Sequence, residues 1–132
     1  MKQKVQILAI DFMSEYEGMV RLSINKNEYS AFFFQDGFET GQTVKVEFDH
    51  LESRLEWDVI FNENKNKELK LEKVINSDWS YHGYGKITSI DPVLATFGDI
   101  DLELGTWTND PNVIGEYIFW QIERLDVSIF KE

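Results

Sequence analysis

The chain has 132 residues, of which 24 are acidic and 13 are basic, and its formal net charge is −11. This length suits a single domain spanning residues 1–132, and a hydrophobic content of 42% excludes a disordered chain. The negative charge argues against nucleic acid and anionic membranes as partners, because both are bound through lysine and arginine.

The first twelve residues, "MKQKVQILAIDF", do not predict a signal peptide. Their apolar run is short, contains Gln6 and ends at Asp11 without a small-residue cleavage site. No run along the chain approaches the roughly 18 apolar residues of a membrane span. Cysteine is absent, which excludes disulfides, thiolate zinc sites and cysteine nucleophiles and fits a reducing compartment. We therefore expect a soluble cytoplasmic protein.

Apolar and polar residues alternate with period two in four segments. These are "MVRLSIN" at 19–25, "TVKVEFD" at 43–49, "RLEWDVIFN" at 54–62 and "DIDLELG" at 99–105. Half-buried antiparallel strands produce this pattern, and no window shows the apolar stripe of a capped helix. Stretches rich in Asn, Asp and Gly separate the segments and suit turns. The sequence predicts an all-β fold, either a small antiparallel barrel or a compact sandwich.

An internal repeat divides this fold into two half-units, residues 4–53 and 85–128. The alignment keeps a constant offset of 80 residues at first and of 74 residues after a shortening. Its matched positions are mainly core aliphatics, turn aspartates and glycines, and they include Ile7 with Ile87, Leu22 with Leu102, and Phe48 with Ile122. Each unit alone leaves one apolar face open, so we expect the two units to pack together by pseudo-twofold symmetry.

Residues 54–84 lie between the half-units. Residues 54–75 predict an inserted hairpin, because two alternating arms flank the polar tip "NENKNK". Residues 76–84, "NSDWSYHGY", form an aromatic joint. Its aromatic side chains either anchor a ligand or partner, since such rings supply large contact areas, or they cover one end of the barrel. The candidate site residues of the joint are Trp79, Tyr81, His82 and Tyr84.

Three acidic residues, Asp99, Asp101 and Glu103, alternate along one predicted strand face. Neighbouring ones are about 7 Å apart by the strand rise, too far for one calcium ion to touch all three. The face is either simply solvated or an acidic patch that attracts lysine and arginine of another protein. Trp107, in the loop "TWTNDPNVIG", is a further candidate that covers a barrel mouth or sits in an interface.

Searches for catalytic and cofactor motifs find none. The two histidines, His50 and His82, have no ligand-like spacing, and neither phosphate-binding glycine loops nor a nucleophile elbow occur. We assign no catalytic residue, no metal site and no cofactor. Whether the chain is an enzyme is left open, because some of the 24 acidic residues must lie close enough to act as carboxylate pairs.

These features favour a non-enzymatic, acidic, cytoplasmic binding module that engages a basic protein partner. A specific form of this hypothesis is an inhibitor or immunity-type protein that covers the basic active site of a toxin. The alternative is a small-molecule-binding β-barrel, or an enzyme with an unrecognised carboxylate site, and either would need a concave pocket. The oligomeric state stays open between a monomer and a homodimer formed through a free strand edge.

Overall fold

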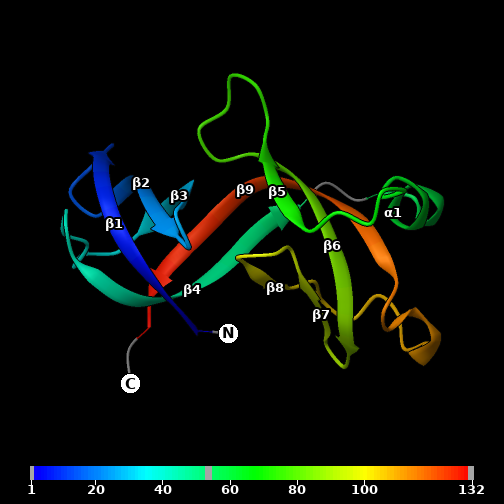
Figure 1. The fold of residues 1–132 in the computed structure, drawn as a ribbon. Helices are drawn as coiled ribbons and strands as arrows, with labels where there is room; N and C mark the ends of the chain where they lie inside the picture. Colours follow the sequence, from blue (N-terminus) through cyan, green and yellow to red (C-terminus); the bar gives the residue numbers. More distant parts are fainter. Residues whose placement is uncertain (1, 53–54, 131–132) are drawn as a thin grey trace.

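The computed structural model describes residues 2–52 and 55–130. Nine strands, one short α-helix and one 3-10 helix form the described part of the chain (Figure 1). The strands are β1 (Lys2–Phe12), β2 (Glu17–Ile24), β3 (Asn27–Phe34), β4 (Thr43–Glu52), β5 (Lys70–Lys73), β6 (Tyr81–Ile90), β7 (Val93–Thr96), β8 (Asp101–Glu103) and β9 (Tyr117–Ile129). The helices are α1 (Trp57–Asn62) and the 3-10 helix η1 (Pro111–Val113).

The strands form one sheet with the order β3-β2-β1-β4-β9-β6-β7-β8, and β5 pairs with β6. In Figure 1, β4 and β9 cross the middle of the molecule, with β1 to β3 on one side and β6 to β8 on the other. A bridge between Phe32 and Asp126 pairs β3 parallel to β9 and closes β3, β2, β1, β4 and β9 into a ring. The other strand pairs are antiparallel. The predicted all-β, barrel-like fold is confirmed.

The two halves have the same strand pairing. In each half the first strand pairs with the second and the fourth, and the second pairs with the third. The register of the first strand is irregular directly after Ile7 in one half and directly after Ile87 in the other. The carbonyl groups of these two residues accept hydrogen bonds of 2.8 Å from the N–H groups of Gly41 and Gly115. The symmetry therefore extends to individual main-chain contacts, while a common ancestry of the halves stays a prediction.

One detail of the predicted repeat differs from the structure. The counterpart of Leu22 is Ala95 instead of Leu102. Leu22 lies opposite Ile7, and Ala95 lies opposite Ile87, whereas Leu102 belongs to the third strand of its half. Both leucines are fully buried, so alternation alone could not distinguish the two alignments.

The hairpin predicted for residues 54–75 is not formed by the described residues. Residues 57–62 are helical, and β5 pairs with β6 rather than with the preceding segment. The same apolar residues also suit a helix, since Trp57 and Phe61 are one turn apart, with ring centroids at 5.1 Å, and Ile60 beside them is buried. The apolar residues of this stretch fit both the strand period and the helix period, and their packing favours the helix.

The aromatic joint also differs from its predicted bounds, because Tyr81 already begins β6 and only residues 74–80 connect the strands. Gly83 and Gly85 allow close packing inside this strand. A Cβ atom on either residue would lie 2.7–2.8 Å from ring carbons of Phe97. The two glycines therefore create a flat surface for a fully buried phenylalanine.

The hydrophobic core extends through both halves, and its fully buried members include Ile7, Leu22, Ile87 and Leu125. Among residues 2–52 and 55–130, no helix has the length and apolar content needed to cross a membrane.

Candidate functional site

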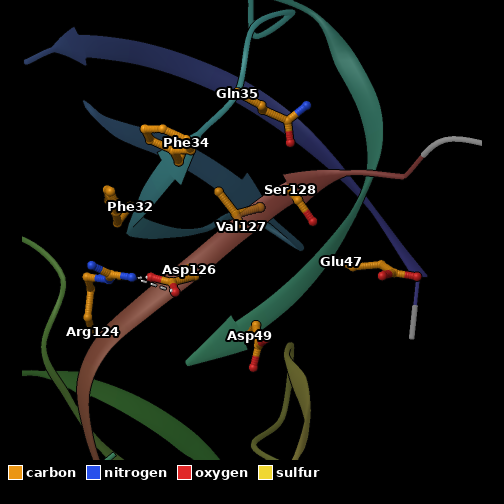
Figure 2. A pocket seen from close by; sticks show the side chains of 9 residues that line it. All are labelled: Phe32, Phe34, Gln35, Glu47, Asp49, Arg124, Asp126, Val127 and Ser128. Carbon is orange, nitrogen blue, oxygen red and sulfur yellow. Dashed lines mark hydrogen bonds and ion pairs between the residues drawn. The ribbon is translucent and has the colours of Figure 1, made fainter. Parts of the chain in front are cut away.

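The outer surface of β3, β9, β4 and β8 forms an acidic groove. It consists of two depressions of about 230 Å³ and about 440 Å³ that share Glu47, Asp49 and Ser128, and the first is drawn in Figure 2. We call this groove the acidic face. Its carboxylates are Glu47, Asp49, Asp101, Glu103 and Asp126.

Strand alternation explains why these carboxylates share one side. On β4, Val46 and Phe48 are buried. Because successive side chains of a strand point to opposite faces, Glu47 and Asp49 point to the outer surface. On β8, the buried Leu102 separates Asp101 from Glu103 in the same way, and β8 lies against β4. The acidic face is thus a consequence of the inward apolar residues on neighbouring strands.

The acidic face includes one cationic side chain, Arg124. Its guanidinium donates two hydrogen bonds of 2.6 Å and 3.0 Å to the carboxylate of Asp126, drawn as dashed lines in Figure 2. The guanidinium also lies 4.1 Å from the ring centroid of Phe32. Hydrogen bonding to Asp126 raises the pKa of Arg124 above its usual value, so the guanidinium stays charged. Glu47, Asp101 and Glu103 make no ion pair among the described residues. A carboxylate oxygen of Asp49 accepts a 2.8 Å hydrogen bond from the N–H of His50 and lies 3.9 Å from Nδ1 of the same residue.

Asp49 faces another carboxylate on the neighbouring strand. It lies directly opposite Asp126 in the antiparallel ladder of β4 and β9. Like charges at directly opposed positions destabilise a sheet, and Arg124 compensates only the Asp126 side of this pair. We therefore expect the opposed carboxylates to lower the stability of the free protein.

An aromatic rim borders the acidic face along β3. Phe34 is 74% exposed, and Phe32 packs edge to face against Trp79 with ring centroids 5.7 Å apart. Figure 2 shows both phenylalanines beside the Arg124–Asp126 pair. Of the aromatic residues predicted from the joint, Trp79 is therefore the one that adjoins the acidic face.

Asp99 does not belong to the acidic face, although it was predicted with Asp101 and Glu103. It accepts hydrogen bonds from Asn25, Asn27 and the hydroxyl of Tyr29, at 3.1, 2.7 and 2.7 Å. Burial acts to raise the pKa of Asp99, and these three donors outweigh burial and lower the pKa below its ordinary value. Burial and the bond to Asp99 raise the pKa of Tyr29, which keeps the hydroxyl protonated as a donor. Asp99 thus links the two halves.

Tyr81 has a structural position. Only 2% of it is exposed, and its hydroxyl accepts a 2.8 Å hydrogen bond from the N–H of Ser30 while donating to the carbonyl of Ser30 at 2.9 Å. Both of these hydrogen bonds of the Tyr81 hydroxyl are therefore made within the protein.

His82 and Tyr84 lie on the opposite side of β6 from Tyr81. Their rings pack on Phe119 of β9, with centroid distances of 5.6 Å and 5.4 Å. The ammonium group of Lys70 lies 5.3 Å from the Tyr84 ring centroid. These partly buried residues form a separate surface cluster away from the carboxylates of the acidic face.

Trp107 packs into a cluster of rings between α1 and β9. It stacks on Trp120 with centroids 5.8 Å apart, and Trp57 and Phe61 of α1 contact it from the side at 5.2 Å and 6.0 Å. Its indole Nε1 is buried and has no hydrogen-bond partner among the described residues.

His50 lies beneath this ring cluster with a side chain that is 4% exposed. Its Nε2 is 3.1 Å from the indole N–H of Trp120 and 2.7 Å from a carboxylate oxygen of Glu52. One ring nitrogen cannot accept from Trp120 and donate to Glu52 together, so the two contacts compete. The described residues contain no group of three or more side chains arranged to hold a metal ion.

Sequence reasoning found two of the five carboxylates, Asp101 and Glu103. Alternation in "TVKVEFD" placed Glu47 and Asp49 on an outer face, which was a usable signal. It could not show that β4 would lie between β9 and β8, because that neighbourhood is set by contacts between distant segments. Asp126 and Arg124 were missed for the same reason.

Comparison with known proteins gives no relative. No family model matches the chain, and no match was found among curated proteins or solved structures.

Proposed function

We propose that this protein is a non-enzymatic binding module whose acidic face receives a basic segment of a partner protein. The observation that carries this proposal is the convergence of five carboxylates from β4, β8 and β9 on one groove that contains a single guanidinium. A groove with this charge attracts lysine and arginine, accelerates their approach and repels acidic competitors.

The cost of the acidic face to the free protein supports a role in binding. Asp49 and Asp126 face one another across the ladder, and a cation from a partner would remove that repulsion. The rim strengthens the case, because the exposed ring of Phe34 offers a stacking surface for an arginine side chain. A like-charge pair beside an open aromatic ring is a poor arrangement for stability alone.

We infer further that the partner is a basic protein whose active surface is blocked by this contact, as an inhibitor or immunity-type protein would block a toxin. A chain without cysteine suits work in the reducing cytoplasm.

The test uses two matched double variants and one defined probe, a hexa-arginine peptide, at low ionic strength. Glu47→Gln with Asp49→Asn removes two charges from the acidic face, and Glu63→Gln with Glu116→Gln removes two exposed charges elsewhere. The first variant should bind the peptide about tenfold more weakly than the second, because net charge is the same in both and only the location differs.

Equal losses of affinity in the two variants would contradict the proposal, since they would show that binding follows net charge alone. A hexa-glutamate peptide is the control for non-specific association and should not bind either variant.

A further inference from the structure

A second concave region lies between the edges of β3 and β5. One depression of about 440 Å³ is lined by residues that include Ser30, Lys73 and Tyr81, and a second of about 330 Å³ includes Lys70 and Asp99. The two depressions share Glu28, Tyr29 and Leu71, so they form one continuous cleft, and none of its residues lies on the acidic face.

Both walls of this cleft are strand edges. β3 pairs with β2 along its whole length, while on its other side it pairs only at Phe32. β5 pairs with β6 and with no other described strand. Each wall therefore presents main-chain groups that lack a neighbouring strand.

The direction of these main-chain groups follows from neighbouring hydrogen bonds. In an antiparallel ladder the N–H and C=O of successive residues point alternately to one neighbour and to the other. Both groups of Ser30 bond to the Tyr81 hydroxyl on the cleft side, so those of Glu28 point into the cleft as well. The N–H of Val74 donates to the carbonyl of Ser80 across the hairpin to β6, so the groups of Leu71 and Lys73 point away from β6, into the cleft.

The two walls also run in the same direction. β3 is parallel to β9, β9 is antiparallel to β6, and β6 is antiparallel to β5. A single extended chain that bonded to both edges would therefore run antiparallel to both or parallel to both, and antiparallel pairing is the more favourable.

The side chains of the cleft define what such a chain would carry. Tyr29, Leu71 and Tyr81 form its floor, and each of them is less than a tenth exposed. Along its walls, Lys70 is held by Glu68 and Glu72 at 2.8 and 3.1 Å. Arg21 pairs with Glu28 at 3.4 Å. Lys73 is exposed and makes no ion pair among the described residues, so it is the cation available to an incoming acidic group.

We propose that this cleft binds an extended segment of another protein by strand addition. The segment lies antiparallel to β3 and β5, bonds to the main chain of Glu28, Leu71 and Lys73, and sets an acidic side chain beside Lys73. This chemistry differs from that of the acidic face, and the proposal does not depend on the function proposed above.

The test begins with a phage-displayed library of random octapeptides panned against the intact chain, followed by synthesis of the enriched peptide. Amide hydrogen exchange of the chain is then measured with and without that peptide. The amides of Glu28, Leu71 and Lys73 should exchange at least about tenfold more slowly in the complex, because they gain hydrogen bonds. The amides of Tyr29 and Glu72 already point into the sheet and serve as internal controls.

Two variants at one position separate main-chain from side-chain recognition. Lys73→Pro removes the cleft-facing N–H without removing a hydrogen bond to β6. This variant should bind the enriched peptide at least about tenfold more weakly. Lys73→Ala keeps the N–H and removes only the charged side chain, so this variant should bind the enriched peptide about threefold more weakly. If Lys73→Pro does not fold, N-methylation of alternate residues of the peptide removes the peptide N–H groups that would bond to the strand edges. Methylation at these residues should then weaken binding.

The proposal is overturned if no octapeptide is enriched, or if the enriched peptide leaves the three amides unchanged. The amides could instead become protected when the concentration of the chain alone is raised, and sedimentation could then show a dimer. That result would identify a second copy of the chain as the occupant of the cleft and would also overturn the proposal. Unchanged peptide affinity in the Glu47→Gln, Asp49→Asn variant is expected, since the acidic face lies outside the cleft.

Discussion

Asp99 and Asp101 are separated by one residue, yet they belong to regions with opposite electrostatic character. Asp99 accepts hydrogen bonds from Asn25, Asn27 and Tyr29 on the other half of the molecule. Asp101 lies on the acidic face among carboxylates and makes no ion pair within the described residues. The charge of Asp99 is used inside the protein, while the charge of Asp101 is open to a partner.

This difference shows that the role of a carboxylate is set by the groups that face it. Three donors around Asp99 replace the water that it loses on folding. Among the described residues, no carboxylate of the acidic face has three such side-chain donors, and the like charges of the face repel one another. Only the second arrangement gains from a cation that arrives from outside, and the predictions below test this separation.

The largest effect is expected for Asp99→Ala, which should lower the free energy of unfolding by about 3 kcal/mol. The substitution removes three hydrogen bonds to a charged acceptor and leaves their donors without it. Urea unfolding followed by tryptophan fluorescence measures the change. Asp101→Ala is the matched control and should change the free energy of unfolding by less than about 0.5 kcal/mol. Similar losses in the two variants would remove the distinction between the regions.

Tyr81→Phe should lower the free energy of unfolding by about 2 kcal/mol. The N–H and the carbonyl of Ser30, a buried residue, both lose their partner when the hydroxyl is removed. This second link between the halves is uncharged, so its loss should be the same at low and high salt. A salt-dependent loss in urea unfolding would contradict this assignment.

A smaller effect is expected in the pH dependence of stability. The pKa of Asp99 is lower in the folded chain than its ordinary value of 3.8. A lowered folded-state pKa contributes stability that is complete above the unfolded-state value and is lost as the pH falls through the folded-state value. The free energy of unfolding should therefore fall less steeply below about pH 4 in Asp99→Asn than in the parent chain. Parallel pH profiles would show that Asp99 does not titrate as proposed.

Much of the strand arrangement could be predicted because alternation reports which face of a strand is buried. The repeat was harder to align, because the halves fill equivalent core positions with different residues. One residue beyond the last pairs of the β1–β2 and β6–β7 ladders come Val5 and Ile24 in the first half, and Gly85 and Phe97 in the second. One half has two aliphatic side chains where the other has a phenylalanine over a glycine. The side chains of two neighbouring strands together fill the same core space in each half, so the residue at any single position can differ between the halves.

The acidic face could be predicted only in part, because its carboxylates come from three strands that are distant in sequence. Asp101 and Glu103 were visible as neighbours on one strand, and Asp49 on another, but nothing local placed Asp49 opposite Asp126. Helix α1 was missed for a related reason, since Trp57 and Phe61 suit both periods and their contact with Trp107 favours the helix. In both places, contacts between distant segments decided the outcome.

The most direct test of the acidic face is a pair of measurements on Asp49→Asn, namely its melting temperature without ligand and its affinity for the hexa-arginine peptide. Removing the charge opposite Asp126 should stabilise the free chain by about 0.5 kcal/mol and raise the melting temperature, while weakening the peptide about threefold. If the acidic face serves binding at the expense of stability, this single variant should be more stable and should bind the peptide more weakly. A lower melting temperature, or unchanged affinity, would contradict the central claim.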